Sequence, residues 1–214
     1  MPEPHAQGVN VYDARGRVVG ARPRDEAKGS GLAVGAVNLL LVSSTGRVLL
    51  QRRPADKENG DRWDKTVGGH VDAGEDFDTT ARREAGEELF SDPASPRARL
   101  VPPGDFGAAL DSVDLSRELV FRREALQLNL RDVRRAPDGR TRNVVYHVAS
   151  YLGRCDIALA DFAPPPEEIA GLRYASAAEV DALLLAGELA PNMSFLWLTH
   201  ARALLSLPGV RVAP

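Results

Sequence analysis

The stretch GGHVDAGEDFDTTARREAGEELF, residues 68–90, carries seven acidic residues in 23 positions. Four apolar residues recur in it at four-residue intervals: Phe77, Ala81, Ala85 and Leu89. At 100° per residue they form one stripe, which predicts a helix from about Asp76 to Leu89 that packs on a sheet. Asp76 and Asp78 suit the positive end of that helix.

Three glutamates adjoin this stripe. Glu84, Glu87 and Glu88 stand at i, i+3 and i+4, so their side chains project from one patch. Carboxylates this close repel one another, and Arg83, four residues before Glu87, offsets one charge. A hard divalent cation offsets the others, since Mg²⁺ is held by a few carboxylates, water and substrate phosphate. A solvated surface helix is the alternative that the three residues alone leave open.

Composition bounds the class of protein. The chain has 214 residues, of which 43% are hydrophobic and 27% charged, which is typical of one globular domain spanning residues 1–214. The formal net charge of −3 gives no reason to expect a nucleic acid polymer, but small phosphorylated molecules remain possible partners. The longest apolar run, residues 32–42, is too short to span a membrane.

The N-terminal residues do not form a secretory signal pattern, and the single cysteine excludes an internal disulfide. Both observations favour a reducing cytoplasm. We expect Cys155 to be a small core residue.

The first half of the chain predicts two hairpins. The first covers residues 9–20, and the second follows a loop at residues 21–31 and turns at Ser44–Gly46. The first strand of the second hairpin is almost wholly apolar, so we expect it in mid-sheet, buried on both faces. A polar loop at residues 54–65 then leads to a short strand around residues 66–71.

The second half predicts a hairpin followed by two helices. We expect irregular structure at residues 91–104, a helix at 111–125, a hairpin at 125–153 that turns at Pro137–Gly139, a strand at 171–176, and helices at 177–187 and 193–207. Together these elements predict an α/β domain whose mixed sheet is covered on both faces by helices, with an N-terminal β-hairpin extension.

The order Gly69, five residues, Glu75, seven residues, Arg83-Glu84, two residues, Glu87-Glu88 resembles the signature of the Nudix hydrolases, which would occupy residues 69–91. Six specified positions match. One departs, because the second glycine of the family's signature is Phe90 here. That glycine allows a left-handed helix cap, so the local turn must be made in another way.

The resemblance implies a Nudix-type α/β/α sandwich and a hydrolase that cleaves a diphosphate linkage in a nucleoside diphosphate derivative or related small organic pyrophosphate. It implies that Glu84, Glu87 and Glu88 ligate Mg²⁺ or Mn²⁺, with the Gly69 carbonyl as a further ligand. It also implies that Glu75 supports the metal site, directly or through water.

By the same resemblance, Arg83 orients a glutamate. The general base stays open between the box glutamates Glu87 and Glu88 and the loop acids Glu118, Glu167 and Glu168.

Residues 9–90 look like the branch of this family that includes isopentenyl-diphosphate isomerase. The isomerases place a catalytic cysteine where Gly68 stands. They also use metal-binding histidines near the strand at residues 32–42, which has none here. These differences favour hydrolysis. A prenyl diphosphate isomerase and a non-catalytic domain that senses nucleotides are the alternatives.

Basic residues in and after the second hairpin are candidates for binding substrate phosphates: Arg52, Arg53, Lys57 and Lys65. His70 is either a structural residue or a metal ligand. Four aromatic residues could stack on a base, although core packing is favoured for each: Trp63, Phe106, Phe121 and Tyr146. Residues 104–125 are expected to shape specificity. The apolar last helix forms a second helical layer or, alternatively, a homodimer surface.

Overall fold

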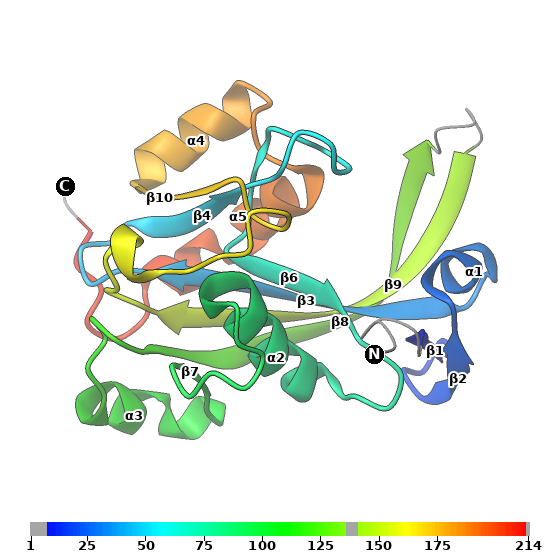
Figure 1. Ribbon diagram of the computed structural model, residues 1–214, viewed down its shortest axis with the longest axis horizontal. Coiled ribbons are helices and arrows are strands. Elements are labelled where there is room, and N and C mark those ends of the chain that lie inside the picture. Colours follow the sequence, from blue (N-terminus) through cyan, green and yellow to red (C-terminus); the bar gives the residue numbers. More distant parts are fainter. Residues whose placement is uncertain (1–7, 136–140, 213–214) are drawn as a thin grey trace.

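A computed structural model describes residues 8–135 and 141–212 (Figure 1). Its strands form one mixed sheet with the central order β10-β4-β3-β9-β8-β7. The strands of this path are β3 (Ala33–Val42), β4 (Val48–Arg52), β7 (Ala98–Leu100), β8 (Leu119–Arg135), β9 (Thr141–Arg154) and β10 (Gly171–Ala175). Four short strands attach to it: β1 (Val9–Tyr12), β2 (Val18–Arg22), β5 (Trp63–Asp64) and β6 (Val67–His70).

Helices cover both faces of this sheet (Figure 1). Helix α2 (Phe77–Phe90) lies on one face, where Ala81, Ala85 and Leu89 are buried against the sheet. Helices α4 (Ala177–Leu185) and α5 (Pro191–Leu205) lie on the other face. The α/β/α sandwich is therefore confirmed, and so is α5 as part of a second helical layer.

Strand β3 occupies the middle of the sheet, as its apolar sequence predicts. It pairs with β9 in parallel and with β4 and β6 in antiparallel orientation. Leu39 and Leu41 face the α2 side, and Leu40 and Val42 face the α5 side. Because both faces are covered, nearly every residue of β3 is buried. Cys155, just after β9, is also fully buried in the core.

The predicted first hairpin is formed by β1 and β2, and β1 also pairs with β3. The predicted loop at residues 21–31 is wrong, because it contains helix α1 (Arg24–Gly29). Pro23 precedes this helix, Asp25 and Glu26 lie in its first turn and Lys28 in its last, so the charges match the helix dipole. Ala27 buries the helix against the sheet.

The predicted helix at residues 111–125 is also wrong. Helix α3 (Phe106–Ser112) ends early, and β8 begins at Leu119. Leu119 and Phe121 enter the core on the α2 side, while Val120 enters the core on the α5 side. These consecutive apolar residues are buried on both faces because they belong to a strand that is paired on both edges. A local sequence pattern does not reveal such pairing. The segment predicted as irregular, residues 91–104, contains the short strand β7.

The predicted loop at residues 54–65 is wrong at its end, because Trp63–Asp64 form strand β5, which pairs with β4. The other elements agree with the sequence. The second hairpin, the strand at β6, the long hairpin of β8 and β9, strand β10 and the last two helices all form. The predicted turn at Pro137–Gly139 lies outside the described residues. Within the described ranges, no helix is long and apolar enough to cross a membrane.

Candidate active site

Arg83 is the centre of the acidic cluster on α2. Its guanidinium donates from Nε to Glu75 Oε1 at 2.9 Å and from Nη1 to Glu87 Oε2 at 2.6 Å. Nη2 lies 3.2 Å from Glu84 Oε1 and 3.2 Å from Asp72 Oδ2. Burial lowers the pKa of Arg83, but these carboxylates raise it overall, so the group stays charged. One cation thus fixes the positions of four carboxylates.

Glu75 is held from a second side, because the hydroxyl of the fully buried Thr80 donates to Glu75 Oε2 at 2.6 Å. Asp76 accepts from the Thr79 amide at 2.7 Å and caps the helix, which confirms its predicted place at the helix start. Asp78 differs from that expectation in part. It lies in the first turn, but it also pairs with Arg123 at 3.0 Å and accepts from the Tyr151 hydroxyl.

Glu84 lies directly against the backbone of Gly69. A β-carbon at position 69 would collide with the Glu84 carboxyl group, so only glycine leaves room for it. Burial raises the pKa of Glu84 to about 7, with Arg83 opposing the shift and Glu87 adding to it. A carboxyl group with this pKa changes charge near neutral pH.

Glu88 is the most enclosed of the three glutamates, at 9% exposure. Its Oε2 accepts from the Gly68 amide at 3.3 Å and from Gln51 Nε2 at 3.4 Å. Burial raises the pKa of Glu88 well above its ordinary value, and the nearby Glu84 raises it further. Glu84 and Glu88 therefore contact adjacent glycines of β6, and burial makes the charged form of each less favourable.

The carboxylate oxygens of these glutamates are the kind of ligand that a hard divalent ion prefers. A cation that joins the half-buried Glu84 and the buried Glu88 stabilises their charged forms, and Mg²⁺ needs only one or two carboxylates besides water and phosphate. Among the described residues, however, no three His, Cys, Asp or Glu side chains are arranged as a ready-made metal cage. In this arrangement Glu87 turns to Arg83 and Glu88 turns to Gly68.

Lys65 is the predicted phosphate-binding residue that lies nearest to the glutamates. Its side chain is 8% exposed and pairs with Asp64 at 3.4 Å. It packs over Gly68, where an added β-carbon would meet the Lys65 Cε atom. The space that a side chain at position 68 would need is thus filled by lysine. Burial raises the pKa of Asp64, but Lys65 and Arg53 lower it overall.

The other three basic candidates lie further from the cluster. Arg53 donates to Asp64 Oδ2 at 3.0 Å and so reaches Lys65 only through that carboxylate. Arg52 is exposed, lies 3.5 Å from Asp61 and approaches the Trp63 ring at 6.0 Å. Lys57 lies 3.9 Å from Glu168.

The loop acids suggested as general bases also lie apart from the glutamates of α2. Glu168 acts electrostatically on Glu88, although its side chain is 53% exposed. Glu167 is exposed on the same loop. Glu118 lies elsewhere, 3.9 Å from Arg99 at a surface hollow of about 770 Å³. By position, Glu168 is the loop acid best placed to reach the cluster.

Sequence reasoning missed Gln51 and gave Asp72 no role. Gln51 could have been found, because it alternates with Leu49 along β4 and must face α2 with it. Asp72 gave no local signal, since its contact with Arg83 depends on the path of the loop before α2. Of the aromatic candidates, Phe106, Phe121 and Tyr146 are buried. Trp63 is partly buried and packs beneath Arg173, whose guanidinium lies 4.3 Å from the ring centroid.

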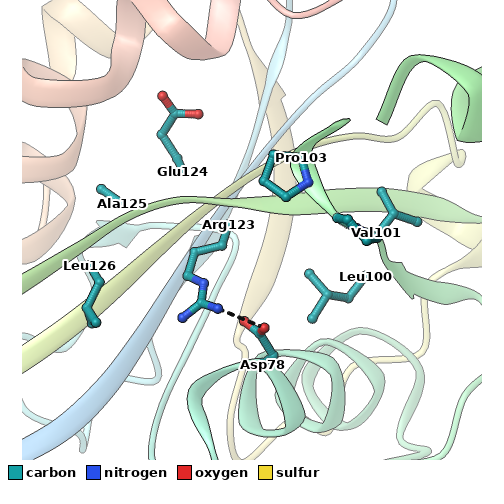
Figure 2. Close-up of a pocket in the computed structure, with 9 residues that line it drawn as sticks. Asp78, Leu100, Val101, Pro103, Arg123, Glu124, Ala125 and Leu126 are labelled. Carbon is teal, nitrogen blue, oxygen red and sulfur yellow. Dashed lines mark hydrogen bonds and ion pairs between the residues drawn. The ribbon is translucent and has the colours of Figure 1, made fainter. Parts of the chain in front are cut away.

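A separate hollow of about 650 Å³ lies between the start of α2, β7 and β8. Figure 2 shows the Arg123–Asp78 ion pair at its wall and Glu124 on the opposite side of the strand. None of the box glutamates lines this hollow. Arg123, Glu124 and Ala125 line this hollow and also belong to the predicted specificity segment, residues 104–125.

A model of the NUDIX domain family matches residues 32–195. The chain belongs to the Nudix family. It is 38% identical over 85 residues to an uncharacterized Nudix hydrolase, PA4841, from Pseudomonas aeruginosa, a match covering 39% of this chain and 50% of the relative. It is 40% identical over 82 residues to another from Streptomyces coelicolor, covering 38% and 45%. The chain therefore spans about half the length of these curated Nudix relatives.

A longer match joins the chain to an isopentenyl-diphosphate Delta-isomerase from Nocardia farcinica. The two are 32% identical over 180 residues, which are 83% of this chain and 84% of the isomerase. This match fits the predicted branch of the Nudix family. Among solved structures, DR0079 from Deinococcus radiodurans aligns with a TM-score of 0.60 and 24% identity, covering 91% of this chain and 97% of that one. That likeness shows a shared α/β fold.

Proposed function

We propose that this Nudix protein is a divalent-metal-dependent hydrolase that cleaves a diphosphate linkage in a nucleoside diphosphate derivative or a related small organic pyrophosphate. The observation that carries the proposal is the pair Glu84 and Glu88, which contact adjacent glycines of β6 and have raised pKa values. Family membership supports it, because all charged positions of the Nudix signature are present.

In this proposal Glu84, Glu87 and Glu88 hold Mg²⁺ or Mn²⁺, with the Gly69 carbonyl and Glu75 in support. When bound, the ion supplies charge neutralisation for phosphate oxygens and acidifies water. Arg83 keeps Glu75, Glu84 and Glu87 in place through ion pairs, and a fourth ion pair joins it to Asp72. Lys65 is the first candidate for contact with a substrate phosphate, and Arg52, Arg53 and Lys57 are candidates at the rim.

Proton transfer needs a carboxylate near the cluster. Glu87 is the least enclosed box glutamate, with a side chain 36% exposed, and can give up its pairing with Arg83. Glu168 is the loop alternative. A positioned general base of this kind contributes about 10²- to 10⁴-fold to the rate.

A second candidate function is isomerisation of a prenyl diphosphate, which the long match to an isomerase favours. Two features argue against it. Lys65 fills the space over Gly68, where the isomerases place a cysteine. None of the histidines of the described residues lies on β3, near which the isomerases use metal-binding histidines.

The deciding experiment is a screen of nucleoside triphosphates, sugar nucleotides, dinucleotides and isopentenyl diphosphate with Mg²⁺. We expect cleavage of a nucleotide substrate, and Glu84→Gln and Glu88→Gln to lower its kcat at least about 100-fold. Glu26→Gln, an exposed change on α1, is the matched control. Full turnover in the two site variants would disprove the metal assignment.

Two other outcomes of the screen have distinct meanings. Rearrangement of isopentenyl diphosphate without any cleavage would establish the isomerase. Nucleotide binding without turnover would establish the sensing domain. We also propose one Nudix domain for residues 1–214, since strands β1 to β10 share one sheet. A cytoplasmic location and a possible homodimer stay predictions.

A further inference from the structure

The hollow between α2, β7 and β8 is a cavity that the candidate active site does not use. Its volume of about 650 Å³ lies within the range of roughly 300 to 1,000 Å³ that is usual for ligand pockets. The charged residues that line it are Asp78, Arg123 and Glu124. The rest of its wall is apolar: Leu100, Val101, Pro102, Pro103, Ala125 and Leu126. An apolar wall with a few polar groups is typical of small-molecule sites.

The hollow exists because β7 ends early. Strand β7 pairs with β8 only along Ala98–Leu100, opposite Leu119–Phe121. The chain then passes through Pro102 and Pro103, which have no N–H to donate to a neighbouring strand. Among the described residues, no strand pairs with this edge of β8 beyond Phe121. The hollow therefore lies beside an open stretch of the sheet edge.

A β-bulge in β8 turns two residues of this stretch toward the hollow. Arg123 is opposite Tyr151 of β9, and Leu126 is opposite Ala149, so Glu124 is an extra residue on β8. Tyr151 and Ala149 both belong to the core on the α2 side, so Arg123 and Leu126 face that side as well. Without the bulge, two positions three apart on a strand would face opposite sides.

Arg123 and Asp78 form a fixed pair of opposite charges at the wall (Figure 2). Arg123 Nη2 donates to Asp78 Oδ2 at 3.0 Å, and the hydroxyl of the fully buried Tyr151 donates to Asp78 Oδ1 at 2.7 Å. Burial raises the pKa of Tyr151, and its bond to Asp78 raises it further, so this hydroxyl stays a donor. The Asp78 carboxylate is thus held from two sides.

Both side chains of this pair remain available to a ligand, since each is 40% exposed. A guanidinium group has several N–H donors, and each carboxylate oxygen accepts more than one hydrogen bond, so the ion pair leaves capacity on both partners. Glu124 adds no charge to the hollow. Its carboxylate lies on the other side of β8 and pairs with Arg122 at 2.8 Å (Figure 2).

The hollow is separate from the acidic cluster on the same helix. Asp78 and Glu84 are six residues apart on α2, so their side chains point about 120° apart around the helix axis. The residues that line the hollow include none of Glu84, Glu87 and Glu88. A ligand in the hollow therefore needs neither these glutamates nor a metal ion that they hold.

We propose that this hollow binds a free α-amino acid with an apolar side chain, at a site distinct from the candidate active site. The carboxylate of the amino acid pairs with Arg123, and its ammonium group pairs with Asp78. A single carbon atom separates these two groups, so both reach the neighbouring charges of the wall at once. The apolar side chain packs against Leu100, Val101 and Leu126.

The charges of the wall favour a zwitterion over a singly charged ligand. One positive and one negative group lie 3.0 Å apart there. A carboxylate alone is attracted by Arg123 and repelled by Asp78, and an amine alone meets the reverse. A ligand that carries both charges gains from both groups. The inference goes beyond the proposed hydrolase function and does not depend on it.

The test compares ligands that differ by one group. L-Phenylalanine and L-leucine carry both charges and an apolar side chain. 3-Phenylpropanoate lacks the ammonium group, 2-phenylethylamine lacks the carboxylate, and glycine lacks the side chain. Their affinities for the full-length protein are measured by titration calorimetry at neutral pH without Mg²⁺. We expect the tighter of the two apolar amino acids to bind at least about tenfold more tightly than each of the other three ligands.

Variants then locate the site. We expect Arg123→Gln and Asp78→Asn each to weaken binding of the amino acid about tenfold. Leu126→Ser changes an exposed side chain, so it should cost little stability and weaken binding about threefold. The matched control is Arg17→Gln, because Arg17 also pairs with an aspartate but lies between β1 and β2, and it should leave the affinity unchanged. The Tm of each variant shows that it is folded.

The outcomes decide both the site and its ligand. Equal binding of 3-phenylpropanoate and L-phenylalanine would overturn the assignment of a zwitterion. Unchanged affinity in folded Arg123→Gln and Leu126→Ser variants would overturn the assignment of the hollow, and absence of binding by both amino acids at millimolar concentration would overturn the inference as a whole. The double variant Glu84→Gln with Glu88→Gln should bind the amino acid normally, so failure of the hydrolase proposal would leave this result unchanged.

Discussion

The glycine at position 69 is required by its neighbour rather than by its own backbone angle. It has no positive φ, yet a β-carbon there would collide with the Glu84 carboxyl group. The end of a glutamate side chain can move, so Gly69→Ala is expected to cost little stability and to displace Glu84. Because small misplacements of catalytic groups cost up to about 100-fold in rate, we expect kcat to fall between tenfold and 100-fold.

The control for this change is Gly107→Ala, an exposed position in α3 where an added β-carbon meets nothing within 4 Å. It should raise helix stability by up to about 1 kcal/mol and leave kcat unchanged. Steady-state kinetics and thermal unfolding of both variants check the pair. A Gly69→Ala enzyme with normal kcat would show that the position of Glu84 is not important.

The single cysteine gives a second prediction for one residue. Cys155 is fully buried, and burial raises the pKa of its thiol to about 11. The nucleophile in alkylation is the thiolate, so the native protein should resist iodoacetamide at pH 8, and the protein in 6 M guanidinium should react. Mass spectrometry of the intact chain measures the fraction alkylated. Rapid native labelling would instead mark Cys155 as an accessible, reactive thiol.

At the scale of one element, α2 depends on its N-terminal cap. Asp76 accepts from the Thr79 amide, and its pKa is lowered mainly by that bond. Asp76→Ala should lower the free energy of unfolding by about 1 kcal/mol, the usual cost of losing such a cap. Chemical denaturation measures it, with the exposed Asp111→Ala at the end of α3 as control. Equal stability of the two variants would mean that packing alone holds the helix.

The C-terminal end of α2 shows how the missing family glycine is replaced. Phe90 remains helical, and Ser91, one residue later, adopts the left-handed conformation with φ of 53°. Its amide donates to the Glu87 carbonyl, and the Asp92 amide donates to the Gly86 carbonyl. The chain passes so close that a β-carbon at Gly86 would collide with Asp92. The left-handed position thus falls on Ser91, and a separate steric requirement for glycine arises at position 86.

At the scale of the whole molecule, we expect the stability of the fold to depend on pH and on bound metal together. The pKa of Glu84 is raised from 4.5 to about 7, so the folded state binds this proton more tightly than the unfolded state. Its contribution to stability is complete below about pH 4.5 and is lost as pH rises through 7, and Glu88 shifts in the same direction. The metal-free protein should therefore lose up to about 3 kcal/mol from Glu84 between pH 5 and pH 8.

Mg²⁺ should reverse this loss, because it binds the ionised carboxylates and stabilises the folded state more at pH 8 than at pH 5. Thermal unfolding at both values, with and without Mg²⁺, measures the effect. The double variant Glu84→Gln with Glu88→Gln should lack both the slope and the Mg²⁺ effect. Carboxylates with lowered pKa values, such as Asp13 and Asp114, titrate below this range. Equal stabilisation by Mg²⁺ at both pH values would contradict the assignment.

The fold was predictable where a segment carried its own period or turn residues. The stripe of α2, the apolar β3 and the glycine turn before β4 each gave a local signal. The prediction failed at α1, which is only six residues long, and at β8, whose burial on both faces depends on β7 and β9. Short elements and paired strands are specified by partners distant in the chain.

The sequence by itself determined the family and the residues of the acidic cluster, because their spacing along one helix is a local property. Only the tertiary structure decided how those residues are used. It joined Asp72 and Glu75 to Arg83, turned Glu88 to the Gly68 amide, and placed Lys65 over that glycine. It also set β3 beside β9, whose paired residues lie more than 100 positions apart in the chain, so no local pattern could specify their register.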